Sequence, residues 1–161
     1  MINIKIICVG KIKEKYLQDA IAEYSKRLSR FCTLDILELN DEKFSPDASL
    51  GDINNVKVKE AFAILSKLDN IKNRYVISLD EAGDMMSSTD FSDCISKLSL
   101  TISTIVFVIG GSLGLSNLVK EKSNKILSFS KMTFPHQLFR VFLLEQLFRS
   151  FKIDANEQYH H

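Results

Sequence analysis

The sequence contains few of the residues that cross-link small extracellular domains or interrupt regular structure. Its 161 residues include three cysteines, two prolines, six glycines and no tryptophan. Cys8, Cys32 and Cys94 are odd in number and far apart, and no Cys-x-x-Cys or Cys/His ligand spacing is present. A disulfide framework and a metal site are therefore not indicated, and reduced, mostly buried thiols are the simplest interpretation.

A long uninterrupted apolar run is also missing. The apolar N-terminal stretch from Met1 to Gly10 is too short to span a bilayer, and Lys5 interrupts it. No positively charged segment precedes this stretch, so a secretory signal peptide is not expected. These absences predict a cytoplasmic protein with no membrane partner.

An excess of charge of one sign is absent from the chain as a whole. The formal net charge is +1, which does not indicate a general nucleic-acid binder. The segment 116–152 is nevertheless basic, with seven lysines and arginines against two glutamates. A locally basic region can steer a polyanion towards a protein, although a solvated surface would have the same composition.

The composition is that of one globular domain. Hydrophobic residues make up 45% of the chain and charged residues 25%, as in ordinary soluble proteins. The length suits one domain with a sizeable core, and neither a linker nor an internal repeat divides the sequence. We therefore expect a single domain over residues 1–161.

Strand-like and helix-like segments alternate along the first two thirds of the chain. Ile2 to Val9 is rich in β-branched residues and ends at Gly10, which predicts a strand. Thr104 to Ile109 is continuously apolar, as in a parallel strand buried on both faces. The expected strands are residues 2–9, 33–39, 74–79 and 104–109, and the expected helices are residues 13–28, 53–68 and 89–98, with residues 40–52 and 80–84 as a loop and a turn. This order predicts an α/β fold with a mostly parallel sheet flanked by helices.

The last third departs from this alternation. A short helix at about 116–122 and a short strand at 125–129 precede a loop at 130–134. Pro135 is expected in the first turn of a long helix that ends near Ile153. This helix is apolar on nearly every side, more than one core-facing stripe needs. A homodimer interface that includes Phe142 and Leu143 is the simplest second surface.

Three turns are expected at the same edge of the sheet, where parallel strands end. They are residues 79–83, the glycine loop 110–115 and residues 129–134. Ligands bind open α/β sheets at this edge, and glycines allow a close approach to the backbone. Such a pocket would offer mainly main-chain hydrogen bonds, which suit a purine ring. The glycines alone fit a plain strand-to-helix turn equally well, and the aromatic side chains of residues 129–134 fit an ordinary core.

Several runs in this sequence resemble the bacterial ribosomal RNA large-subunit methyltransferase H family. The runs are Phe107–Leu115, Leu127–Val141, Glu145–Arg149 and Tyr159–His160, together with Val9–Tyr16 and Glu23–Leu28. The most specific part is Ser128 to Arg140, and the resemblance covers almost the whole chain. It implies a SPOUT-class fold with a C-terminal trefoil knot and a homodimer.

The resemblance also implies an activity and a cofactor. Members of this family methylate N3 of a pseudouridine in large-subunit rRNA on the assembled ribosome, with S-adenosylmethionine as methyl donor and no metal. The implied cofactor contacts are Leu79, Gly110, Phe129, Ser130, Lys131, Met132, Thr133 and Phe134. These positions coincide with the three turns.

Four further residues are candidates for the target side of the site: His136, Arg140, Tyr159 and His160. His136 and Arg140 are four residues apart, and hence on one helix face, and we expect Arg140 to contact RNA phosphate or the base. The resemblance implies that the C-terminal tail with Tyr159 and His160 folds over an active site. That active site could belong to the partner subunit. Glu145 and Arg149, also four apart, are expected to form a structural ion pair.

Two other functions fit parts of the sequence. A ribosome-associated binding protein could keep the fold without turnover, and it would bind S-adenosylmethionine without methylating ribosomes. A different α/β enzyme could use the Gly110 loop for ATP or NAD.

Overall fold

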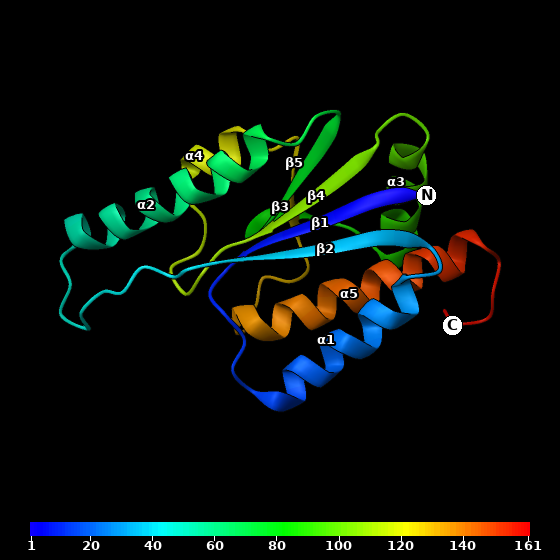
Figure 1. Ribbon diagram of the computed structural model, residues 1–161, viewed down its shortest axis with the longest axis horizontal. Coiled ribbons are helices and arrows are strands. Elements are labelled where there is room, and N and C mark those ends of the chain that lie inside the picture. The colour runs from blue at the N-terminus through cyan, green and yellow to red at the C-terminus, as the bar shows by residue number, and fades with distance from the viewer.

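Five strands form one fully parallel sheet in the computed structural model, which describes residues 1–161 (Figure 1). The strands are β1 (Ile2–Val9), β2 (Cys32–Leu39), β3 (Arg74–Met85), β4 (Thr104–Ile109) and β5 (Lys125–Ser128). Their order across the sheet is β2-β1-β4-β3-β5. Every neighbouring pair is parallel, so the carboxyl ends of the strands meet at one edge. The predicted α/β class is therefore confirmed.

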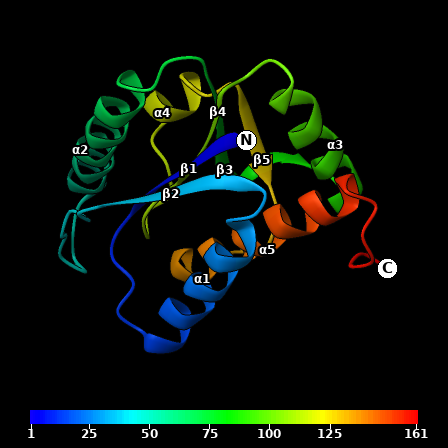
Figure 2. The ribbon, with the colours of Figure 1, turned by 45° about the vertical axis from the view of Figure 1, so that its right-hand side comes forward.

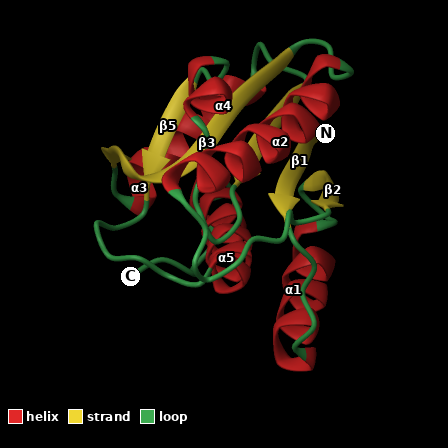
Figure 3. Ribbon diagram, turned by 90° about the vertical axis from the view of Figure 1, so that its left-hand side faces the viewer, coloured by secondary structure: helices red, strands yellow, loops and turns green.

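Five helices cover both faces of this sheet (Figures 2 and 3). They are α1 (Lys15–Leu28), α2 (Leu50–Asp69), α3 (Ser88–Ser99), α4 (Asn117–Glu121) and α5 (His136–Asp154). Helices α1, α3 and α5 pack on one face through a large apolar cluster, and α2 and α4 pack on the other through a smaller one. None of the five helices combines the length and the apolar character that a bilayer crossing needs.

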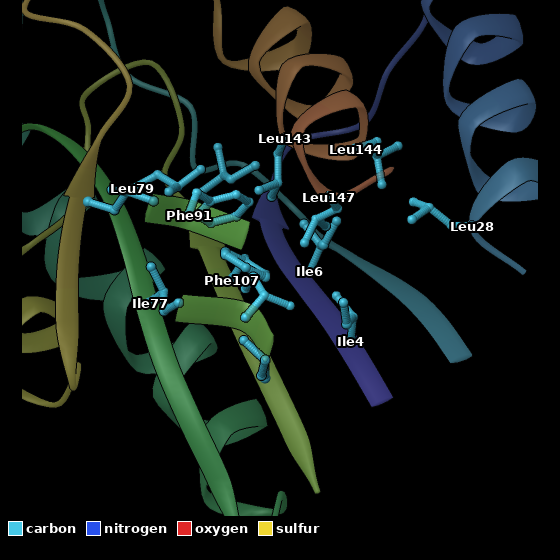
Figure 4. Close-up of a cluster of buried hydrophobic side chains, with 14 of the residues drawn as sticks. Ile4, Ile6, Leu28, Ile77, Leu79, Phe91, Phe107, Leu143, Leu144 and Leu147 are labelled. Atoms are coloured by element: carbon cyan, nitrogen blue, oxygen red, sulfur yellow. The ribbon is translucent and has the colours of Figure 1, made fainter. Parts of the chain in front are cut away.

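The larger core cluster lies between the sheet and α5. Leu143, Leu144 and Leu147 of α5 are fully buried. Leu143 lies on the side of Phe91, Leu147 lies beside Ile6 of β1, and Leu144 lies on the side of Leu28 of α1 (Figure 4). The central strand β4 is buried along its whole length, because helices cover both of its faces. Burial raises the pKa of Cys8 and of Cys32 to about 11, so these two thiols are protonated and unreactive at neutral pH.

The all-round apolar character of α5 has an explanation within the chain. This helix lies between α1 and α3 on the sheet, so three of its sides meet apolar neighbours. Phe31 stacks on Phe151 with ring centroids 5.4 Å apart, and Phe142 is only half-buried. Leu143 is 0% exposed in its own core, so placing it in a dimer interface was wrong. The homodimer and the knot stay predictions.

The elements begin and end close to the expected positions, with three differences. Helix α2 begins at Leu50, three residues early, because Ser49 and Asp52 form a reciprocal capping box. Strand β3 runs on to Met85 through the expected turn, and its pairing with β5 shifts register between Leu79 and Asp84. Pro135 is the residue before α5 and not part of its first turn.

Candidate functional site

A cleft of about 740 Å³ opens at the carboxyl edge of the sheet, between the three expected turns. Its walls are residues 79–82 after the regular part of β3, residues 109–115 after β4 and residues 129–136 before α5, except Lys131. Lys57, Lys120 and Phe139 complete the lining. The volume lies within the range of small-molecule sites, and the edge is the one at which α/β sheets bind ligands.

Within the glycine loop, the backbones of Gly110 and Gly114 pack closely against one another. A Cβ built on Gly110 would lie 2.7 Å from the carbonyl carbon of Gly114 and 2.8 Å from its oxygen. Gly114 itself has φ +77°, and its N–H donates to the Gly111 carbonyl oxygen at 3.0 Å. Only glycine fits Gly110 without displacement of the backbone, and Gly114 has a conformation that glycine adopts readily. The loop therefore presents main chain to the cleft.

The segment between β5 and α5 is fixed by its own hydroxyl groups. The Ser128 hydroxyl donates to the Ser130 carbonyl oxygen at 2.9 Å, and Ser130 Oγ accepts from the Met132 N–H at 3.0 Å. The Thr133 hydroxyl donates to a Glu81 carboxylate oxygen at 2.9 Å, which joins two walls of the cleft. Phe129 packs on Phe139 with centroids 5.1 Å apart, so its side chain belongs to the core, as its sequence context allowed.

Seven of the eight expected cofactor residues line the cleft, in agreement with their placement at the three turns. They are Leu79, Gly110, Phe129, Ser130, Met132, Thr133 and Phe134. The eighth, Lys131, is exposed and does not line it. Their contacts with a ligand remain a proposal.

An ion pair at the rim of the cleft was not predicted from the sequence. Lys120 Nζ lies 2.8 Å from Asp80 Oδ2, and the other Asp80 oxygen accepts from the Ala82 N–H. Burial raises the pKa of Asp80, but the Lys120 ammonium and the Ala82 N–H outweigh it and leave the pKa below its ordinary value. Asp80 follows an expected strand directly, whereas no spacing pointed to Lys120.

His136 is the first residue of α5, and it lines the cleft beside Gly10 of the β1 end. Its Nε2 is 3.6 Å from where a Cβ on Gly10 would lie. Burial and then the charge of Arg140 lower the pKa of His136 below its ordinary value of 6.5, while Asp41 and Glu14 oppose this shift. The imidazole is therefore neutral at pH 7.

This lowered pKa predicts a pH dependence of stability. Below pH 6.5 the unfolded chain takes up a proton that folded His136 resists, so the free energy of unfolding falls as the pH drops. We expect urea unfolding to show a smaller loss between pH 7.5 and 5.5 in His136→Gln than in the wild type, by a fraction of a kcal/mol. An equal loss in both proteins would contradict the shift.

Arg140 lies under the site and not at its surface. Only 2% of its side chain is exposed, and its NH1 donates to Glu38 Oε2 at 2.6 Å. Its NH2 donates to the Gly10 carbonyl oxygen at 2.5 Å, and Glu38 also accepts from the Ile12 N–H. Because the Arg140 guanidinium is buried, it is not exposed for the expected contact with RNA. Arg140 instead joins the start of α5 to the segment after β1.

Breaking this buried pair is expected to destabilise the protein. Glu38→Ala leaves the Arg140 charge buried without its carboxylate and removes the acceptor for Ile12, so we expect a loss of about 2 kcal/mol. Thermal unfolding would move down by about 4–8 °C. The matched control is Asp35→Ala on the same strand, which breaks the more exposed pair with Lys5 and should cost less than about 1 kcal/mol. Equal losses would show that the Arg140 pair is not special.

The C-terminal tail lies against the second half of α5. Tyr159 is half-buried and meets Phe148 edge-on, with centroids 5.0 Å apart. His160 Nδ1 is 3.2 Å from Arg149 NH1. Arg149 lies thirteen residues after His136, which is about 20 Å along a helix. The structure therefore brings His136 to the cleft but does not bring Tyr159 and His160 to the same cleft.

Comparisons with known proteins agree over the whole chain. The sequence model of the family described as "Predicted SPOUT methyltransferase" matches residues 2–160. The chain is 57% identical over 159 residues to the "Ribosomal RNA large subunit methyltransferase H" of Clostridium botulinum (strain Okra / Type B1), which covers 98% of this chain and 99% of that protein. The protein of the same name from Clostridium novyi (strain NT) gives the same identity and coverage.

A solved structure has the same fold at low sequence identity. It is "The structure of a probable methylase family protein from Haemophilus influenzae Rd KW20", with a TM-score of 0.58 at 12% identity. The match covers 99% of this chain and 71% of that one. At this identity the likeness bears on the fold alone.

Proposed function

Because the chain belongs to the SPOUT methyltransferase family, and within it to the ribosomal RNA large-subunit methyltransferases H, we propose that it methylates N3 of a pseudouridine in large-subunit rRNA on the assembled ribosome. S-adenosylmethionine is the methyl donor. The observation that carries this proposal is the 57% identity over nearly the full length of both chains. Assembled ribosomes as substrate imply a cytoplasmic protein.

The cleft at the carboxyl edge fits this cofactor. Its volume suits a nucleoside-sized ligand, and Gly110, whose missing side chain lets the Gly114 backbone pack against it, lines the cleft with main chain. Backbone groups at Leu79, Gly110 and residues 130–134 would hold the adenosyl part, with apolar side chains beneath it. When bound, the cofactor supplies an electrophilic methyl group on a sulfonium.

The residues of this chain have three tasks in the transfer. The walls of the cleft hold the acceptor nitrogen in line and keep water away, which removes an entropic part of the barrier. The imide nitrogen must also lose its proton. His136 is neutral and lines the cleft, so we assign it the acceptance of that proton at its free ring nitrogen.

The position of the tail supports the proposal of a homodimer. Tyr159 and His160 lie against the second half of α5, and neither residue lines the cleft of its own chain. We propose that they bind the target base at the partner's cleft. This arrangement requires two copies and makes each active site from both.

Three measurements test the proposed function. Calorimetry should show S-adenosylmethionine binding, and purified ribosomes should gain one methyl group per large subunit. Mass mapping of rRNA from cells with and without the gene should place that methyl on one pseudouridine. Binding without any methylation would instead indicate a ribosome-associated binding protein.

A further inference from the structure

One carboxylate holds the tip of the C-terminal tail. Glu145 Oε1 accepts hydrogen bonds from Arg149 Nε at 3.1 Å, from Arg149 NH2 at 2.7 Å and from the Tyr159 hydroxyl at 3.3 Å. Its Oε2 accepts from Gln146 Nε2 at 2.8 Å. The Glu145–Arg149 pair expected from the sequence is confirmed, but an ion pair alone does not need the bond to Tyr159.

Arg149 extends this arrangement to the next tail residue. Its guanidinium lies over the Tyr159 ring, 4.9 Å from the centroid, and its NH1 contacts the His160 ring nitrogen. Tyr159 is thus held by Glu145 at its hydroxyl, by Arg149 on its face and by Phe148 at its edge. The two tail residues assigned to the target base therefore depend on Glu145, one directly and one through Arg149.

The base of the tail has a separate anchor. Glu157 pairs with Arg30 at 2.7 Å and with Lys152, which fixes the turn after α5. Loss of Glu145 would therefore release the tip while the tail still begins in the same place. The Glu157 pairs alone would attach the tail to the rest of the protein. The additional contacts of Glu145 with the tip therefore indicate that the orientation of the tip matters.

Glu145 also lies towards the cofactor cleft. It borders a pocket of about 340 Å³ whose wall includes Phe129, Ser130 and Phe134, which also line the cleft. Gln146 borders the same pocket and accepts from the Ser88 hydroxyl at the start of α3. Glu145 is therefore held on a rigid helix between the tail and the elements that form the site.

We propose that Glu145 is a positioning residue for methyl transfer, which orients Tyr159 directly and His160 through Arg149 for contact with the target base. This inference rests on the proposed function. In this proposal Glu145 acts on the target base only through Tyr159 and Arg149.

The test compares Glu145→Ala with Glu145→Gln, which keeps an acceptor oxygen at the same place. The matched control is Glu23→Ala, which removes the same i,i+4 Glu–Arg pair from α1, where Arg27 Nε lies 2.9 Å from Glu23. We expect Glu145→Ala to lower kcat on ribosomes about 100-fold, because a small misplacement of a binding group has that effect. Glu145→Gln should recover most of this loss, and Glu23→Ala should keep wild-type kcat. All three should bind S-adenosylmethionine as the wild type does.

A second readout follows the tail without catalysis. The ring current of Phe148 shifts the NMR signals of Tyr159, and these signals should move towards unfolded-chain positions in Glu145→Ala but not in Glu145→Gln or Glu23→Ala. Wild-type kcat in Glu145→Ala, or unmoved Tyr159 signals, would overturn the inference while the wild-type enzyme still methylates. Inactive wild-type protein would instead overturn the proposed function, and the inference with it.

Discussion

Gly110→Ala is expected to lower the affinity for S-adenosylmethionine at least about 100-fold in a chain that still folds. The added Cβ would lie 2.7 Å from the carbonyl carbon of Gly114, and backbone atoms cannot rotate away as a side chain does. The loop must then shift as a whole, at a cost of about 1–3 kcal/mol in stability. Main-chain groups that hold the cofactor move with it, and each lost backbone hydrogen bond weakens binding further.

The same substitution at Gly51 provides the control. Gly51 lies in the first turn of α2, and a Cβ there meets only the Ser49 hydroxyl at an ordinary 3.7 Å. Gly51→Ala should raise the free energy of unfolding by about 0.5–1 kcal/mol and leave binding unchanged. Calorimetry and urea unfolding measure both effects. Wild-type affinity in Gly110→Ala would mean that the cofactor does not bind at this loop.

Most of the fold could be predicted from the sequence, because its strands and helices follow the simple hydrophobic periods. β4 is the clearest example, since a short apolar run rich in β-branched residues is typical of a strand covered on both faces. The order of the strands could not be predicted, since it depends on which pairings bury most surface. The extension of β3 past Leu79 was missed because its charged residues are typical of a turn, whereas pairing with β5 holds them in a strand.

The site was predictable where it consists of backbone and not where it depends on distant pairs. The glycine loop and its neighbouring turns follow from the edge at which parallel strands end. Arg140 and Glu38 are 102 residues apart in the chain, so no local spacing could reveal that they bind one another. Arg140 was therefore assigned to the surface, although it is buried. Leu143 was misplaced for a similar reason, because the sequence pattern of α5 is compatible both with packing on its own sheet and with packing on a partner.

Removal of Tyr159, His160 and His161 is expected to reduce methylation of ribosomes at least about 1,000-fold. The loss is larger than for Glu145→Ala because the groups themselves disappear. The core below them stays intact, since Tyr159 is only half-buried and Glu157 still anchors the turn after α5. Cofactor affinity, light scattering and circular dichroism should match the wild type. Full activity of the shortened chain would remove the tail from the mechanism.

A mixture of two impaired proteins, assayed at an S-adenosylmethionine concentration too low to saturate Gly110→Ala, tests where the tail acts. Heterodimers of the shortened chain and Gly110→Ala contain one protomer with an intact cleft and no tail, and one with a tail and a damaged cleft. If the tail serves the partner, the intact cleft meets the intact tail, and mixing should restore up to about half of the wild-type activity per heterodimer. The lining of each cleft contains neither Tyr159 nor His160 of the same chain, which favours this result. A mixture as inactive as its components, with heterodimers shown by native mass spectrometry, would mean that each tail bends back to its own cleft and that the orientation in this structure is not the active one.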